Sequence, residues 1–98
     1  MGTRQSVKLS SLDNVETALQ DLDAGMRVGV ETKVALVDDI PYGHKFAIDE
    51  IGVGEPVIKY GTKIGTALRT IRVGEHVHVH NVKEIVEDVR SELRMNLS

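Results

Sequence analysis

A seven-residue pattern that occurs twice constrains the fold of this chain more than any other feature. The segments Ile51–Val57 and Ile71–Val77 share the pattern Ile-x-Val-Gly-Glu-x-Val at an offset of 20 residues, and Leu22–Val28 resembles it more loosely. In each copy a glycine, which adopts positive φ without steric cost, precedes residues typical of a short strand. We therefore predict a small β-domain in which glycine turns feed strands, with internal pseudo-symmetry but without the long array of a solenoid.

The composition agrees with one β-rich domain. Of the 98 residues 41% are apolar and only 3% aromatic, so the core must consist mainly of Val, Ile, Leu and Ala. Branched aliphatic residues favour strands, and a chain of this length forms a single domain.

Charge and cysteine content exclude several classes of function. The net charge is -3, and Lys and Arg are scattered along the chain, so we expect no nucleic-acid partner. Without cysteine, the strong metal ligands left are His, Asp and Glu. No apolar run is long enough for a signal peptide or a membrane span, and we expect a soluble, cytoplasmic protein.

Local patterns predict a helix near each end of the chain. Residues 1–12 read as an arm or a short edge strand. Asp13 and Glu16 have the spacing of a capping box, and apolar residues then recur at helical spacing, which predicts a helix over Asn14–Leu22. Near the other end, residues 83–98 contain an apolar stripe that predicts an amphipathic helix over Lys83–Met95, with Asn81 as its N-cap.

Between these helices the pattern changes to that of strands and turns. Met26–Val30 and Lys33–Val37 predict a hairpin, and Asp38–Gly43 contains the proline and glycine of a reverse turn. The segment Val57–Ala67 predicts a second strand pair, with glycines placed for a tight turn or a close backbone approach.

Three histidines alternate with valines near the end of the predicted β-domain. A strand through His76, His78 and His80 would put all three imidazoles on one face. Such a row can ligate a divalent metal or bind carboxylate and hydroxyl groups. However, neighbours on one strand face lie about 6.5–7 Å apart, wider than ligands around one metal, so the spacing by itself favours an ordinary solvent-facing strand.

Other candidates are weaker when taken one at a time. His44 follows a Pro-x-Gly turn, where functional residues are frequent, although a single histidine is more often simple polar surface. Lys59 and Tyr60 could anchor an acid group, but an ordinary strand with its lysine in water is the simpler interpretation.

Several of these segments together resemble the small domain of the altronate dehydratase family, which also includes galactarate dehydratase and the small subunit of sulfolactate sulfo-lyase. The motifs that carry the resemblance are Ile-Pro-Tyr-Gly-His-Lys-Phe-Ala from Ile40, Gly-Glu-Pro-Val-Ile-Lys-Tyr-Gly from Gly54, Ile-Gly-Thr-Ala from Ile64, and Gly-Glu-His-Val-His-Val-His-Asn-Val from Gly74. Asp13-Asn14-Val15 and Gly25 also match, so the resemblance covers Asp13 to Val82.

The resemblance implies a fold of the SAF or β-clip type over residues 13–82, similar to antifreeze-protein-like modules. With the helices predicted above, we expect a mostly β domain with short flanking helices and a C-terminal amphipathic helix.

The resemblance also implies a function. The chain would be the small subunit or N-terminal domain of a metal-dependent sugar-acid dehydratase, a hydro-lyase, or of a related hydroxy-acid lyase such as a carbon–sulfur lyase. It would work beside a large catalytic subunit on a small sugar acid or hydroxy acid and would be inactive without that subunit. The implied cofactor is a divalent metal, iron or manganese. The resemblance allows for a metal held mainly by the large subunit, and it also allows for a homo-oligomer.

Elimination next to a carboxylate requires a base, an acid or Lewis acid, and positive charge on the carboxylate. On the matching motifs we predict His44 and His78 as catalytic residues and His78 and His80 as metal ligands. The predicted substrate-binding residues are Lys45, Lys59, Tyr60 and Asn81. His76 is outside this set, because its position varies in the family pattern. The alternative is a non-catalytic binding or assembly module whose histidine strand forms an interface.

Overall fold

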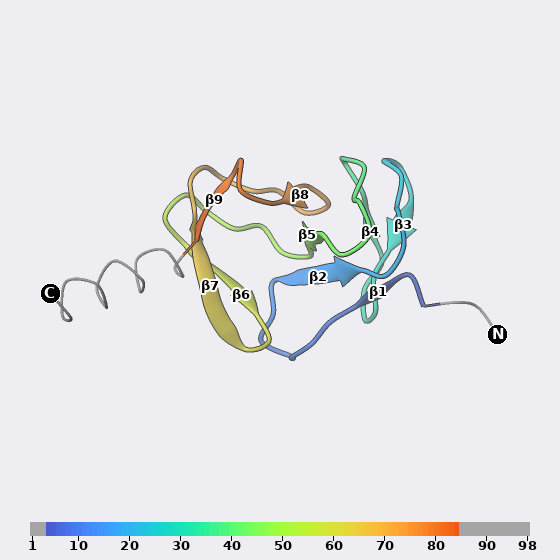
Figure 1. Ribbon diagram of the computed structural model, residues 1–98, viewed down its shortest axis with the longest axis horizontal. Coiled ribbons are helices and arrows are strands. Elements are labelled where there is room, and N and C mark those ends of the chain that lie inside the picture. Colours follow the sequence, from blue (N-terminus) through green and yellow to red (C-terminus); the bar gives the residue numbers. More distant parts are fainter. Residues whose placement is uncertain (1–3, 85–98) are drawn as a thin grey trace, which may run out of the picture.

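The computed structural model describes residues 4–84, which form nine short strands in three antiparallel sheets and contain no helix (Figure 1). The central sheet has the order β1-β2-β5-β8, a second sheet pairs β3 with β4, and the third has the order β6-β7-β9. The strands of the central sheet are β1 (Ser6–Val7), β2 (Val15–Ala18), β5 (Lys45–Ala47) and β8 (His76–Val77). The other strands are β3 (Arg27–Val28), β4 (Val34–Ala35), β6 (Pro56–Lys59), β7 (Thr62–Ala67) and β9 (Val82–Glu84).

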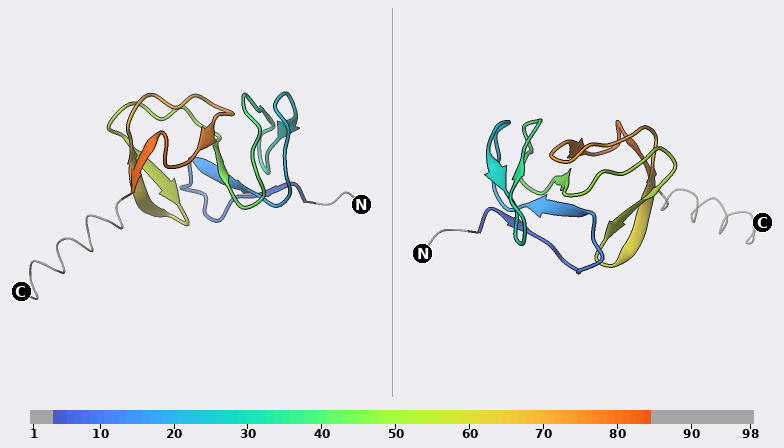
Figure 2. Two further views of the ribbon diagram at one scale, coloured as in Figure 1. Left: turned by 45° about the horizontal axis from the view of Figure 1, so that its top comes forward. Right: turned by 180° about the vertical axis from the view of Figure 1, so that it is seen from behind.

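The central sheet lies between the other two. The hairpin of β3 and β4 is at one end of the molecule and the sheet of β6, β7 and β9 at the other, as the views of Figure 2 show. The protein is thus mostly β, as predicted. No membrane-crossing helix occurs between residues 4 and 84.

Four similar glycine turns organise these sheets. Each turn follows a buried aliphatic residue, closes with a backbone hydrogen bond of 2.9–3.1 Å, and has at its third position a glycine with φ between 82° and 91°. These are the features of a type II turn. The aliphatic residues and glycines of the four units are Leu22 and Gly25, Ile40 and Gly43, Ile51 and Gly54, and Ile71 and Gly74. The predicted repeat is confirmed, and it has a fourth copy beginning at Ile40.

The four units associate in pairs. Leu22 forms an antiparallel bridge with Ile40, and Ile51 forms one with Ile71. Each bridge belongs to its own core cluster. The first cluster contains Ala18, Leu22, Val28, Val34, Leu36, Ile40 and Phe46. The second contains Val15, Ala47, Ile51, Val57, Ala67, Ile71, Val77 and Val82. Strands β2 and β5 supply residues to both clusters and thereby join the two halves.

Both predicted strand pairs are confirmed. Strands β3 and β4 pair in register, with Arg27 opposite Ala35. Strands β6 and β7 are joined by Tyr60 and Gly61, whose φ angles of 59° and 69° are those of a two-residue type I′ turn.

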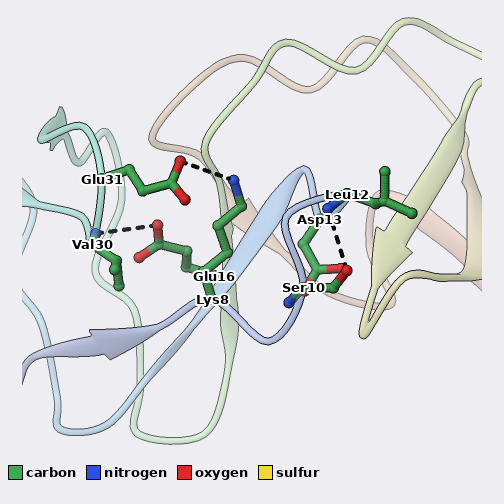
Figure 3. Close-up of polar contacts among 7 residues, drawn as sticks. All are labelled: Lys8, Ser10, Leu12, Asp13, Glu16, Val30 and Glu31. Carbon is green, nitrogen blue, oxygen red and sulfur yellow. Dashed lines mark hydrogen bonds and ion pairs between the residues drawn. The ribbon is translucent and has the colours of Figure 1, made fainter.

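The helix predicted over Asn14–Leu22 is wrong, because this segment contains β2, the second strand of the central sheet. Val15 and Ala18 are buried as a helical stripe would be, but Glu16 between them is only 2% exposed. A strand with neighbours on both sides can bury both of its faces if its polar side chains find partners. The Ser6 hydroxyl donates to Glu16 Oε1 at 2.7 Å. The Val30 N–H donates to Glu16 Oε2 at 3.3 Å, as Figure 3 shows.

Asp13 and Asn14 do not begin a helix but tie β2 to the β6–β7 hairpin. The Asp13 carboxylate accepts hydrogen bonds from the N–H groups of Ser10 and Gly61. The Asn14 amide accepts from the Ile58 N–H at 2.8 Å and donates to the Pro56 carbonyl at 3.0 Å. Figure 3 shows Asp13 in the bend after Ser10.

The second predicted helix is not supported where it can be compared. Lys83 and Glu84 belong to strand β9. The rest of the predicted helix is part of residues 85–98, which lie outside the described residues. Asn81 has its amide turned toward the preceding loop instead of capping a helix. Within the predicted N-terminal arm, residues 6 and 7 form the edge strand β1.

Candidate functional site

Antiparallel pairing of β5 with β8 brings together histidines that are 32 residues apart. In this pairing Phe46 lies opposite His76 and Lys45 lies opposite Val77. His44, the last residue of the glycine turn that begins at Pro41, immediately precedes β5. As a result, His44 Nδ1 lies 2.9 Å from His76 Nε2, and one of these nitrogens donates a hydrogen bond to the other.

The other two histidines lie in the loop after β8 and not on an extended strand. The chain turns at His78, whose carbonyl accepts a hydrogen bond from the Asn81 N–H at 3.1 Å. The Asn81 side chain is fully buried; its oxygen accepts from the His78 N–H at 3.0 Å, and its nitrogen donates to the His76 carbonyl at 2.8 Å. The Asn81 side chain therefore fixes the backbone at His76 and at His78.

The imidazole rings stack against one another. The centroids of His44 and His78 are 4.4 Å apart, those of His44 and His76 5.1 Å, and those of His76 and His78 5.4 Å. The exposed His80 ring is tilted by 34° against His76. We refer to His44, His76 and His78 as the three-histidine cluster.

The surroundings favour the neutral form of two of these imidazoles. Burial, and after it the nearby His44, His80 and His78, lowers the pKa of His76, whereas the Asp38 carboxylate opposes this shift. Burial and the positive charges of His44, Lys45 and His80 likewise lower the pKa of His78, against the effect of Glu84. Neutral imidazole is the form that ligates metals.

The donor set of the three-histidine cluster fits a divalent metal. Each residue offers one ring nitrogen, and these nitrogens lie within 4.8 Å of one another. His76, which the family resemblance left out, is part of this set, and His80, a predicted ligand, is not. The sequence signal that could have identified His76 is the alternation of His76 with His78, but the contribution of His44 depends on strand pairing.

A small cavity adjoins the cluster. It has a volume of about 180 Å³ and contains one residue of the cluster, His78, beside Lys45. The rest of its lining is supplied by Ile64, Val77, Val79, Val82 and Glu84. The half-buried Lys45 ammonium has no hydrogen-bond or ion-pair partner among residues 4–84. Burial, followed by repulsion from Lys59, lowers the pKa of Lys45, and Glu84 acts in the opposite direction.

The predicted substrate-binding residues lie in different surroundings. Lys45 lines the cavity, and Lys59 is near enough to act on the Lys45 charge. Tyr60 is 72% exposed in the β6–β7 turn, which lies at the end of that hairpin away from β8 (Figure 1). Asn81 has no exposed surface and uses both ends of its amide within the loop.

Comparison with known proteins gives a consistent family. A family model described as the altronate/galactarate dehydratase SAF domain matches residues 4–85. Altronate dehydratase of Escherichia coli (strain K12) is 46% identical over 86 residues, which cover 87% of this chain and 17% of that protein. Galactarate dehydratase (L-threo-forming) of the same organism is 37% identical over 75 residues, 72% of this chain and 14% of that protein.

A third relative is a separate subunit. The (2R)-sulfolactate sulfo-lyase subunit alpha of Chromohalobacter salexigens is 59% identical over 46 residues, 47% of this chain and 49% of that subunit. This chain therefore covers only a small part of the two dehydratases and about half of the lyase subunit. Because the family model matches most of its length, the chain belongs to the altronate/galactarate dehydratase SAF domain family.

Proposed function

We propose that this chain is the small module, either a subunit or an N-terminal domain, of a metal-dependent sugar-acid dehydratase or related hydroxy-acid lyase in the cytoplasm. The observation that carries this proposal is the three-histidine cluster beside a cavity that contains the Lys45 ammonium, which has no ion-pair partner in the described part of the chain. The named relatives include two dehydratases and a sulfo-lyase subunit, which supports an elimination reaction.

The residues of the site match what elimination from a hydroxy acid requires. A half-buried ammonium that no carboxylate of residues 4–84 bonds directly can bind the carboxylate of a ligand, so Lys45 is the proposed carboxylate anchor. His44 and His78, whose imidazoles are in contact, are the proposed catalytic residues, each as a proton carrier or, with a metal bound, as its ligand. A divalent metal at this site would supply Lewis acidity toward the departing hydroxyl group.

The module needs a larger partner to form the complete site. A cavity of about 180 Å³ is smaller than a typical ligand pocket and is lined by only one cation, one carboxylate and one imidazole besides its apolar residues. The dehydratase relatives devote 14% to 17% of their length to the part that matches this chain. We therefore propose a large catalytic subunit or domain as the partner and no turnover by this chain alone.

The test is co-expression with the large subunit of the same family, followed by assays with altronate, galactarate and sulfolactate. We expect His44→Ala and His78→Ala to lower kcat and Lys45→Gln to raise the KM for the acid. Lys63→Gln is the matched control, because Lys63 is an exposed lysine on β7 outside the cavity lining. If the complex forms and turnover is unchanged in both histidine variants, the chain is an assembly module without a catalytic role.

A further inference from the structure

We propose that His44, His76 and His78 form a metal site that this chain occupies by itself, without a large subunit. The ligand class is a divalent transition metal of the kind that imidazole nitrogen prefers: zinc, iron, cobalt, nickel or copper. The inference rests on the proposed function only for the use of the metal. Binding as such depends on residues of this chain alone.

The positions of the ring nitrogens support a shared metal. Imidazole binds zinc at about 2.0–2.1 Å, so two adjacent ligand atoms of one metal lie about 3 Å apart. His44 Nδ1 and His76 Nε2 are 2.9 Å apart already. One ring nitrogen from each of the three histidines, His78 included, lies within 4.8 Å of the other two, a separation that a small rotation of the half-buried His78 side chain can reduce.

The chemistry of the cluster favours transition metals over calcium or magnesium. All three donors are imidazole nitrogens, and no carboxylate belongs to the ligand set among the described residues. Calcium and magnesium prefer oxygen ligands, whereas three nitrogens with open coordination positions are typical of catalytic zinc and related metals. Because His78 also lines the Lys45 cavity, a metal bound at the cluster would lie beside the place proposed for the acid.

Asn81 is a positioning residue for this site. Its amide fixes the backbone at His76 and at His78, so two of the three ligands depend on it. Asn14 offers a matched comparison, because its amide makes the same pair of bonds to the backbone of β6, away from the histidines. Loss of either amide removes a similar tie, but only one of them supports the ligands.

The first experiment is isothermal titration calorimetry of the full chain with zinc chloride, repeated with cobalt chloride and visible absorption spectroscopy. We expect one site per chain and at least about a tenfold weaker affinity in His44→Ala, His76→Ala and His78→Ala. His80→Ala is the control and should stay within about threefold of the unchanged chain, since its ring lies outside the ligand set. No saturable binding, or an equal loss in His80→Ala, overturns the proposal.

A second measurement does not depend on variants that must fold. In the unchanged chain, imidazole nitrogen resonances of His44, His76 and His78 should shift on addition of zinc, and those of His80 should shift much less. Shifts confined to His78 and His80 would contradict the assigned ligand set.

The positioning role of Asn81 is tested by a pair of variants. Asn81→Ala should weaken zinc binding about tenfold or more, while Asn14→Ala should leave the affinity unchanged even though it lowers stability.

The outcomes separate this proposal from the proposed function. Zinc binding by the isolated chain together with an inactive complex would leave the metal site standing and reject the lyase role. An active complex whose isolated small module binds no metal would reject the metal site and leave the lyase role standing.

Discussion

Single buried polar side chains hold distant segments of this protein together. Among the described residues, Ser6, Asp13, Glu16 and Asn81 are buried, and no buried side-chain nitrogen or oxygen lacks a hydrogen-bond partner. Ser6 bonds to Glu16 from a neighbouring strand, Asp13 reaches Gly61, and Asn81 closes the histidine loop. Each of these groups would carry a large desolvation cost without its partner, so each contact is specific.

We expect Asp13→Asn to lower the free energy of unfolding by about 1–3 kcal/mol at pH 7. Burial alone would raise the pKa of Asp13, but the N–H groups of Gly61, Tyr60, Ser10 and Leu9 together lower it below 3.8. A carboxyl group with a lowered pKa stabilises the fold above its unfolded pKa, and this contribution is lost as the pH falls through the folded pKa.

Urea unfolding of both proteins between pH 7 and pH 3 measures this effect. The difference in stability between the unchanged chain and Asp13→Asn should shrink as the pH falls below about 4. A difference that stays constant down to pH 3 would show that the charge of Asp13 contributes nothing.

The glycine turn is the repeating element of the fold, and its four copies are not equally tolerant. Gly54 has a φ of 82°, and no atom of residues 4–84 lies within 4 Å of the position that a Cβ would take. Gly74 has a similar φ of 89°, but a Cβ there would overlap the carbonyl group of Ala35. The two positions therefore separate the cost of the backbone angle from the cost of a close approach.

We expect Gly54→Ala to destabilise the chain by about 1–2 kcal/mol, the cost of a left-handed backbone for an L-residue. Gly74→Ala should cost about 2–5 kcal/mol, because overpacking against a backbone atom adds to the same angular strain. Denaturant unfolding of the two variants gives the comparison. Equal losses would mean that the contact with Ala35 relaxes without cost.

At the level of elements, the sequence predicts what local geometry determines. The two hairpins and the four glycine turns follow from strand alternation and from glycines that need positive φ. The turn at Pro41 was predicted as a reverse turn but not as a copy of the repeat, because Pro41 and Tyr42 stand where the recognised copies have other residues.

Strand β2 was misread because its pattern is also compatible with a helix. Val15, Ala18 and Leu22 are spaced as on a helical face, and Glu16 has the spacing of a cap residue from Asp13. What makes the segment a strand is its place between β1 and β5, together with partners for Glu16 from Ser6 and Val30. These contacts join segments that are distant in the sequence, so the local residue pattern around Glu16 cannot predict them.

The candidate site was predictable only in part for the same reason. The alternation from His76 to His80 indicated that imidazoles gather in this region, and the family motifs indicated His44 and Lys45. The combination of His44 with His76 depends on the register of β5 against β8, in which Phe46 lies opposite His76. Register between strands far apart in sequence cannot be read from either strand alone.

For the whole molecule, the proposed metal site predicts a change in thermal stability. A ligand that binds only the folded chain stabilises it by about 2.7 kcal/mol at a concentration 100 times its Kd. For a domain of this size, that free energy corresponds to a rise in Tm of roughly 10–20 °C. We expect zinc to raise the Tm, a chelator to reverse the rise, and His44→Ala to show no rise. A Tm that zinc does not change in the unchanged chain contradicts the prediction.

The pairing of β5 with β8 also has a consequence for synthesis of the protein. His44 leaves the ribosome long before His76 and before Asn81, which fixes the loop around the second and third histidines. The assembled cluster therefore cannot exist before Asn81 has been synthesised. If the proposed metal site is correct, a metal that recognises the assembled cluster would be loaded only after translation of the β-domain.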